Sequence, residues 1–438
     1  MTDRTLTFAL RAGAIFALAL STACAGGDDD DNSIVTPRDG GAPRDGGPEF
    51  ECTVNLDCDA ATPYCDENRV CAQPPAGFEI GYGDQTAQSV DLTLIHEPTR
   101  NVQTTDLEFH PTRTNELWVL HRWAYQARPC TQADSSGCGS LDGSTTTISN
   151  VGTQDQVAEW KTDGNAWHFM RRPPALAFSA DNDNFATCGE AWSGNFLPVP
   201  WDDGVTFIGP SLWSSDPAVY AITPPGGNGS HLDMLHETPL CTGIAWEPGN
   251  ASGNVFWLIN GETGSLDRYD FENDHGPGND DHSDGELLRY APGTIARVEH
   301  VPSHMVFDAS NGLLFVADTG NKRIVALDTT TGSRGGGINP VWEPLAVDAM
   351  MNNAMVYDIV APGVLEAPSG LELHNDLLYV SDTAQSRIYV FDRGGNEINR
   401  LDTGLAAGEL GGMAFGPDGK LYLGLVNSGD VYRIDPKQ

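Results

Sequence analysis

The sequence predicts an all-β protein, a six-bladed β-propeller that follows a small disulfide-rich module and a disordered tether. Three observations carry this prediction. A strand-like motif recurs six times after residue 86, 49 glycines and 28 prolines imply many tight turns, and four of the nine cysteines fall between residues 52 and 71. The 438 residues also exceed what one unrepeated hydrophobic core usually fills.

The repeated motif is a small residue followed by apolar residues at the third and fifth places, which is the period-two pattern of a β-strand. A turn and a second apolar strand follow each copy, as in residues 308–316. Units of this kind leave few exposed sheet edges when they are arranged radially, so the repeat favours a closed ring. The six copies begin at Thr105, Pro174, Thr242, Ser303, Ser369 and Gly411.

The last copy of the motif leaves room for one strand fewer than the others before the C-terminus. Residues 88–96 alternate in side-chain character as a strand does, and they precede the first copy. We expect this segment to supply the missing strand. Both ends of the propeller, residues 86–438, would then meet in one sheet.

Two segments, residues 314–328 (LFVADTGNKRIVALD) and 378–392 (LYVSDTAQSRIYVFD), resemble NHL repeats. A weaker resemblance extends over residues 100–438. The chain is distantly similar to the propellers of amidating lyases and gluconolactonase-type lactonases. This resemblance implies six blades and a ligand site at the channel mouth, where the innermost strands begin.

In those two enzyme groups the first position of the innermost strand carries the metal ligands, which are histidines in one and Glu, Asn and Asp in the other. None of the six corresponding residues of this chain is of these types. We therefore expect a binding or scaffold module for a protein or small ligand at the cell surface, rather than an enzyme. The expected ligand-binding mouth comprises Thr105, Asp106, Thr242, Ser303, His304 and Ser369.

An enzyme is the alternative interpretation. Residues 119–122 (VLHR) resemble the lyase segment that bears an active-site arginine, and the resemblance maps that role onto Arg122. A metal-assisted hydrolase or lyase would use Arg122 together with His121, His304 and Glu190. Convergence of these four side chains around one pocket would favour catalysis, whereas scatter would favour binding.

Residues 1–23 have the pattern of an export signal, because two arginines flank an apolar run that is too short to span a membrane. The small residues before Cys24 resemble a lipoprotein cleavage site. This implies lipidation of Cys24 and anchoring in the bacterial cell envelope through the lipid alone. A plain secretory signal is the alternative. Residues 24–51 then form an acidic Gly/Pro-rich tether, and residues 72–85 form a linker.

Without Cys24 the chain has an even set of eight cysteines, which suits four disulfides in an oxidising compartment. A zinc site is the alternative for the module at residues 52–71, but its cysteine spacing and an exported location favour disulfides. The connectivity among these four residues stays open: Cys52, Cys58, Cys65 and Cys71. In the propeller the predicted pairs are Cys130 with Cys138 and Cys188 with Cys241.

The formal charge of −37 repels nucleic acid, so a nucleic-acid partner is excluded. Residues 270–286 concentrate seven carboxylates and two histidines within one predicted loop. So many carboxylates close together favour the binding of a divalent cation, most of all Ca²⁺. The alternative is an acidic loop that is only solvated. The proposed ligands are Asp270, Asp274, Asp280, Asp281 and Asp284.

Overall fold

The computed structural model describes residues 52, 57–58, 62, 64–83, 85–123, 142–194, 207–338 and 343–437. The chain divides into two compact units, Met1–Glu49 and Phe50–Gln438. The first unit lies outside the described residues. Within the described part of the chain, no helix has the length and apolar content needed to cross a membrane.

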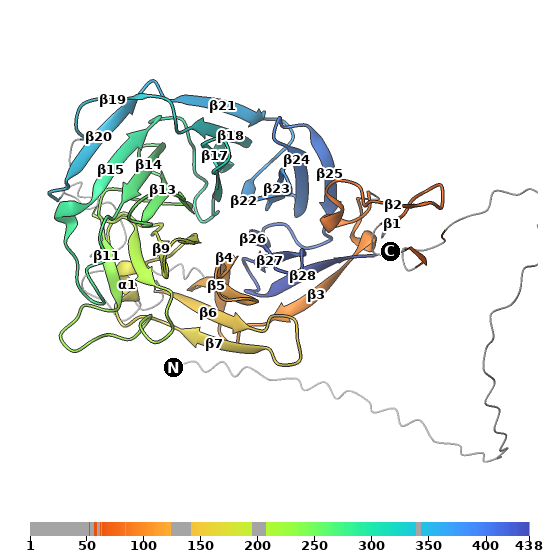
Figure 1. Ribbon diagram of the computed structural model, residues 1–438, viewed down its shortest axis with the longest axis horizontal. Helices are drawn as coiled ribbons and strands as arrows, with labels where there is room; N and C mark the ends of the chain where they lie inside the picture. The colour runs from red at the N-terminus through yellow and green to blue at the C-terminus, as the bar shows by residue number, and fades with distance from the viewer. Residues whose placement is uncertain are drawn as a thin grey trace, which may run out of the picture. The chain divides into compact units, whose positions relative to one another are not determined.

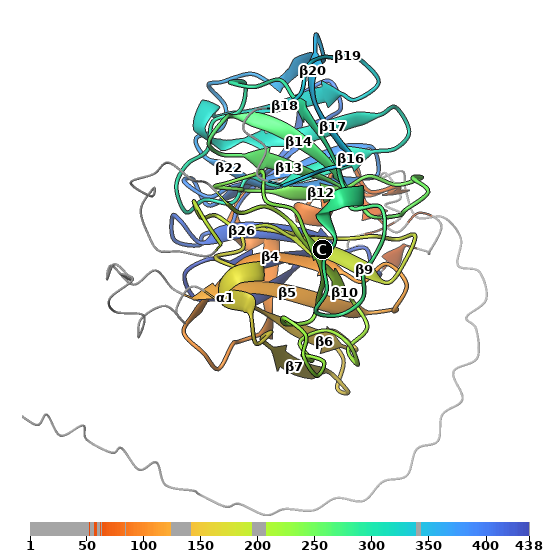
Figure 2. The ribbon, with the colours of Figure 1, turned by 90° about the vertical axis from the view of Figure 1, so that its left-hand side faces the viewer.

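Six sheets stand around one centre and form the predicted propeller (Figure 1). Contacts between neighbouring innermost strands run around the whole ring, from β4 through β8, β12, β16, β22 and β26 back to β4. Figure 2 shows the sheets from the side, together with the short helix α1 (Ala166–Phe169), which packs against β6. The fold class and the number of blades predicted from the repeat are therefore confirmed.

The blades succeed one another in chain order. The strands of each blade are named from the innermost to the outermost. Blade one contains β4 (Val102–Phe109), β5 (Glu116–Trp123), β6 (Gly143–Ser149) and β7 (Val157–Lys161). Blade two contains β8 (Leu176–Phe178), β9 (Asn184–Thr187), β10 (Ser211–Ser214) and β11 (His231–Met234). Blade three begins with β12 (Ile244–Trp246), β13 (Val255–Asn260), β14 (Ser265–Asp270) and β15 (Glu286–Tyr290).

The second half of the ring repeats this order. Blade four contains β16 (Met305–Asp308), β17 (Leu313–Asp318), β18 (Arg323–Asp328) and β21 (Met355–Val360). Blade five contains β22 (Pro368–His374), β23 (Leu377–Asp382), β24 (Arg387–Asp392) and β25 (Glu397–Asp402). Blade six contains β26 (Leu410–Phe415), β27 (Leu421–Leu425), β28 (Val431–Pro436) and β3 (Val90–His96).

The hydrophobic core consists of six clusters, one at each interface between neighbouring blades. Period-two alternation places apolar side chains on both faces of each sheet, and each face packs against the next blade. Trp118, Trp213 and Trp257 are fully buried in these interfaces. The segments that lead into β12 and β16 approach so closely that a Cβ atom on Gly243 would lie 1.9 Å from the Ser303 carbonyl oxygen.

The ring closes where the N-terminal strand β3 completes the sheet of the last blade. β3 pairs antiparallel with β28, with Leu92 opposite Ile434 and Asp91 opposite Asp435. The Thr93 hydroxyl also donates a hydrogen bond to the Asp435 carboxylate at 2.6 Å. This is the closure that the alternating pattern of residues 88–96 predicted.

Blade three carries an extension that the sequence did not indicate. After β18 the chain leaves blade four and forms β19 (Ser333–Arg334) and β20 (Val347–Asn352), and β20 pairs parallel to β15. The chain then returns to add β21 to blade four. Period-two patterning identifies strands but does not say to which sheet they belong, so this excursion was not predictable from the repeat.

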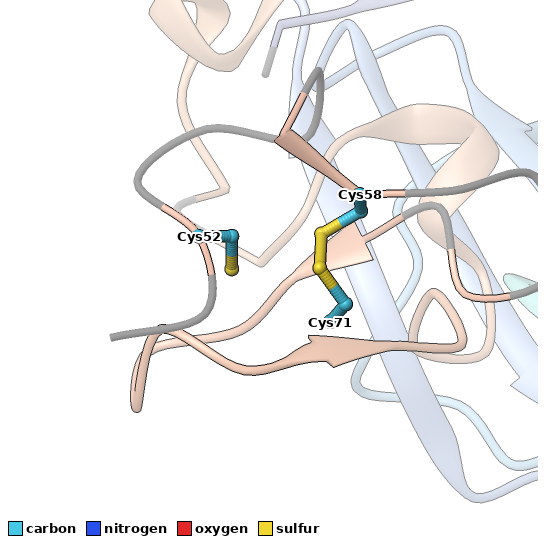
Figure 3. A group of neighbouring side chains, drawn as sticks. All are labelled: Cys52, Cys58 and Cys71. Atoms are coloured by element: carbon cyan, nitrogen blue, oxygen red, sulfur yellow. A yellow bond between two sulfur atoms is a disulfide. The ribbon is translucent and has the colours of Figure 1, made fainter. Parts of the chain in front are cut away.

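The cysteine-rich module contains β1 (Tyr64–Cys65) and β2 (Cys71–Ala72), which pair with each other. Its disulfides join Cys52 to Cys65 and Cys58 to Cys71, and Figure 3 shows the second bond. Sulfur atoms of three of these cysteines lie close together, but disulfides occupy all of them, which rules out the zinc alternative.

A third disulfide joins Cys188, directly after β9, to Cys241, shortly before β12. This is the pair that we predicted between blades two and three. Cys130 and Cys138, like Cys24, lie outside the described residues. Residues 77–81 of the expected linker lie against blade five, where the Asn399 amide donates to the carbonyl oxygens of Gly77 and Gly81 at 2.9 Å each.

Candidate functional site

A pocket of about 390 Å³ opens at the end of the channel where the innermost strands begin. Its lining comes from the start of β4, the end of β5, the segments before β16, β22 and β26, and turns after β23 and β27. The pocket therefore lies at the mouth that the family resemblance implies. The residues that line it are Gln103, Arg122, His300, Val301, Pro302, Ala367, Thr383, Ala384, Gly408, Val426 and Asn427.

Arg122 lies near the end of β5 and lines the pocket. Its side chain is only 3% exposed. Its Nη1 atom lies 3.0 Å from the Oε2 atom of Glu190, which is equally buried. Nη2 donates to the His300 carbonyl oxygen at 2.6 Å, and Nε donates to the Gln103 side chain at 2.9 Å. Burial lowers the pKa of Arg122, and the charge of Glu190 opposes that effect.

Glu190 also contacts an arginine and a backbone N–H group of the segment that precedes blade four. Arg297 Nη1 lies 3.3 Å from Glu190 Oε1, and the backbone N–H of His300 donates to the same oxygen at 2.7 Å. Burial alone would raise the pKa of Glu190, but the bond from His300 and the charges of Arg122 and Arg172 bring it below its usual value. Three arginines thus surround one carboxylate beside the pocket, although the chain as a whole carries a charge of −37.

The described pocket lining includes none of the six residues that we expected at the mouth. They are almost fully buried, and several tie neighbouring blades together. The Ser369 hydroxyl donates to the Pro302 carbonyl at 2.8 Å, and the Thr105 hydroxyl donates to the Pro173 carbonyl at 3.0 Å. The full set is Thr105, Asp106, Thr242, Ser303, His304 and Ser369.

The four side chains expected in an enzyme do not meet at one point. Arg122 and Glu190 pair, but His121 faces the other side of β5, where it contacts the Thr104 and Thr146 hydroxyls at 3.1 and 2.9 Å. His304 Nδ1 instead lies 3.3 Å from an Asp106 carboxylate oxygen. Burial lowers the pKa of His121 to about 3 and that of His304 to about 4, so both imidazoles are neutral near pH 7.

Three carboxylates of the innermost strands influence one another, Asp106 and Glu108 on β4 and Glu372 on β22. Asp106 accepts hydrogen bonds from the backbone N–H groups of Leu107 and Leu176 at 2.8 and 2.9 Å. Burial raises the pKa of Glu372 well above its usual value, and the charges of Glu108 and Asp106 raise it further. The channel interior therefore favours protonated carboxyl groups.

The acidic loop does not gather the five predicted carboxylates around one point. Asp270 accepts a hydrogen bond from Ser252, Asp274 from the backbone of Gly276, and Asp281 from Ser283. The other two approach histidines instead, with Asp280 Oδ2 3.6 Å from His231 and Asp284 Oδ1 3.3 Å from His275. A calcium site made of all five oxygens is therefore not preformed in the described loop.

Sequence reasoning identified Arg122 and Glu190 but missed their neighbours at the mouth. Arg172, Arg297 and His300 lie in connections between blades, where the strand repeat carries no information. One signal was available, because adjacent Arg171 and Arg172 stand out in a chain that has only 24 basic residues.

No protein-family model matches the sequence, and no curated protein sequence does. Among solved structures, an auxiliary nutrient binding protein from Bacteroides ovatus is 11% identical, with a TM-score of 0.46 over 80% of this chain and 76% of that one. A streptogramin B lyase is 12% identical, with a TM-score of 0.41 over 80% and 97% of the two chains. A luciferin-regenerating enzyme is 12% identical, with a TM-score of 0.44 over 79% and 95%. Likeness at these identities concerns the fold alone.

Proposed function

We propose that the protein is an exported binding module whose channel mouth takes a small organic anion, such as a carboxylate. The observation that carries this proposal is the buried guanidinium of Arg122 in the pocket lining, with Arg297 and Arg172 beside it around a single carboxylate. Several arginines beside one buried carboxylate favour an anionic ligand at the mouth. A guanidinium carries five N–H donors, and Gln103, Glu190 and His300 take three of those of Arg122, so a ligand carboxylate would meet the other two.

The size and lining of the pocket suit a small ligand with an apolar body. Its volume of about 390 Å³ lies within the usual range for small-molecule sites, roughly 300–1,000 Å³. Val301, Pro302 and Val426 supply apolar surface, while Thr383 and Asn427 offer polar groups. A few polar groups that orient a mostly apolar ligand are typical of binding sites.

Binding is favoured over catalysis because the proposed catalytic side chains are dispersed. A hydrolase or lyase needs an acid–base group within hydrogen-bonding reach of its partner in the pocket. His121 is on the other side of β5 and His304 is in the channel interior, each with a contact of its own. The fold by itself supports neither role.

The test is a binding screen with paired probes, namely benzoate, phenylacetate and glutarate against benzamide, phenylacetamide and glutaramide. We expect at least one acid to raise the melting temperature and to give binding heat, and its matched amide to do neither. Ala384 is exposed and lines the pocket, so Ala384→Leu should fill the mouth and abolish binding without unfolding the protein. The matched control is Ala251→Leu, an exposed alanine outside the lining.

Two results would contradict the proposal. Amides that bind as tightly as their acids would remove the preference for anions. Equal binding to wild-type protein and Ala384→Leu would place the ligand elsewhere on the molecule.

We also propose that the binding module is held at the membrane by a lipid on Cys24. The disulfides of the module and of blades two and three support an oxidising location outside the cytoplasm. Labelled palmitate should enter the protein in a host that processes lipoproteins, and Cys24→Ser should abolish the label. Equal labelling of Cys24→Ser would refute the anchor and leave the binding proposal intact.

A further inference from the structure

A second polar cluster lies between blades two and three, away from the channel mouth. It contains five of the eleven histidines of the chain, which are His168, His231, His236, His275 and His282. The His168 and His236 rings lie 5.9 Å apart between centroids, and the His236 and His282 rings lie 5.1 Å apart. Imidazole is the commonest protein ligand for metals, so this concentration calls for a chemical explanation.

The cluster forms because the acidic loop docks on the outermost strand of blade two (β11 in Figure 1). The backbone N–H of His275 donates to the Leu232 carbonyl at 3.2 Å, and that of Gly278 donates to the His231 carbonyl at 2.8 Å. These hydrogen bonds hold the loop along β11 and bring its histidines and acids to the side chains of that strand.

Three side chains meet at this junction with the spacing of metal ligands. His275 Nε2 lies 3.9 Å from Asp233 Oδ2 and 3.3 Å from Asp284 Oδ1, and the three ligand atoms are within 4.8 Å of one another. Zinc holds nitrogen and oxygen ligands at about 2.0–2.2 Å, so tetrahedral ligands sit somewhat more than 3 Å apart. The 3.3 Å separation therefore fits two ligands of one ion, while Asp233 lies somewhat farther from His275 and would move closer on binding.

Asp233 gives an independent reason to place a cation here. Its side chain is fully buried, and its Oδ1 atom accepts a hydrogen bond from the backbone N–H of Met234 at 2.7 Å. Its Oδ2 atom, which faces His275, has no hydrogen-bond partner among the described residues. A buried carboxylate oxygen without a donor is costly, and a cation beside it would offset that cost.

A neighbouring triplet has a different explanation. His236 Nδ1 and His282 Nδ1 both contact Glu343 Oε2, at 2.6 and 3.0 Å, and Glu343 Oε1 accepts from the His236 backbone at 2.6 Å. Ordinary hydrogen bonds satisfy this carboxylate without a metal. In the proposed site the imidazole ligand is His275, and an imidazole ligand favours transition metals over Ca²⁺.

We propose that Asp233, His275 and Asp284 bind a divalent transition-metal ion of the Zn²⁺ class at the seam between blades two and three. The ion neutralises the buried carboxylate and fixes the docked loop on β11. Three protein ligands leave a fourth position for water or for a ligand from outside. This site is independent of the proposed anion pocket.

The experiment uses chelator-treated full-length protein with free thiols blocked. Zn²⁺ and Ca²⁺ are titrated by calorimetry, thermal melts are recorded in parallel, and Co²⁺ serves as a spectroscopic probe. We expect saturable heat and a raised melting temperature with Zn²⁺, and a Co²⁺ spectrum without thiolate charge-transfer bands. Asp233→Asn, His275→Gln and Asp284→Asn should each weaken Zn²⁺ binding by more than about 10-fold, since even outer-shell substitutions cost roughly 10- to 100-fold.

Asp274→Asn is the matched control, because it removes the same charge from the same loop, and among the described residues Asp274 accepts a hydrogen bond from the Gly276 backbone alone. It should bind Zn²⁺ like the wild type. Asp233→Asn keeps the shape of the side chain, and circular dichroism checks that each variant is folded. Binding of Ca²⁺ without Zn²⁺, or loss of binding in Glu343→Gln but not in the three ligand variants, would overturn the proposal. The absence of heat with either metal would do the same.

Discussion

At the scale of single residues, burial decides which carboxylates of this acidic chain carry charge. Glu190 is buried beside Arg122 and Arg297, and its pKa falls below the usual value. Glu372 lies in the channel near Glu108 and Asp106, and its pKa rises well above the usual value. The surroundings therefore shift the same residue type toward the anion at the mouth and toward the neutral acid beside the other two carboxylates.

The channel carboxylates predict a decline of stability with rising pH. Because the folded-state pKa of Glu372 lies above its unfolded value of 4.5, its contribution is complete below about pH 4.5 and is lost as the pH rises through the folded-state pKa. Asp106 and Glu108 shift in the same direction, and neighbouring His304, with a pKa lowered to about 4, stays neutral over this range. We expect Glu372→Gln to stabilise the protein at pH 8 by roughly 1–3 kcal/mol.

The measurement is urea unfolding at pH 5 and pH 8 with disulfides intact. The difference in unfolding free energy between the two pH values should be smaller for Glu372→Gln than for wild type. Glu97→Gln, at an exposed position, is the control and should leave the difference unchanged. A Glu372→Gln variant with the wild-type pH profile would show that Glu372 is ionised at little cost in the channel.

At the scale of elements, the strands were predictable because each carries its own alternating pattern. All six innermost strands lie where the motif placed them, and β3 completes blade six as expected. The parallel addition of β20 to blade three was not foreseen, because pairing depends on the partner strand and on where the intervening chain travels. The disulfide between Cys188 and Cys241 was predictable because the sequence already placed each cysteine next to the end of a predicted strand.

This disulfide should stabilise the junction of blades two and three. It closes a loop with a sequence separation of 53 residues, for which the chain-entropy relation gives about 4 kcal/mol, and engineered or strained bonds give less. We expect the double variant Cys188→Ala, Cys241→Ala to lose about 2–4 kcal/mol of unfolding free energy in urea. Removal of Cys58 and Cys71 is the control, because that bond lies in the module outside the blades. If both double variants lost the same unfolding free energy, the effect of the Cys188–Cys241 bond would not be specific to the junction of blades two and three.

At the scale of the whole molecule, the ring depends on one strand that comes from far away in the sequence. β3 covers the edge of β28, and without it the last sheet would expose unpaired backbone groups. Ile95 and Val90 also belong to the clusters on the two faces of blade six. Closure therefore contributes both backbone pairing and buried apolar surface.

We expect a variant that begins at residue 98, and so lacks β3, to melt at a lower temperature and to associate through the open edge of β28. A variant that begins at residue 86 keeps β3 and is the matched control. Thermal melts and size-exclusion chromatography compare the two. If both remain monomeric with the same melting temperature, the ring is held by the interfaces between blades without the added strand.

The sequence by itself determined the class of fold, the number of blades and the closing strand, because those properties follow from local alternation repeated along the chain. Tertiary structure decided which polar side chains meet. The mouth joins Gln103, Arg122 and His300 from separate blades and connections, and the metal site joins a strand of blade two to a loop of blade three. Which side chains meet depends on where the loops fold back in space. The spacing of residues along the chain does not predict these distances.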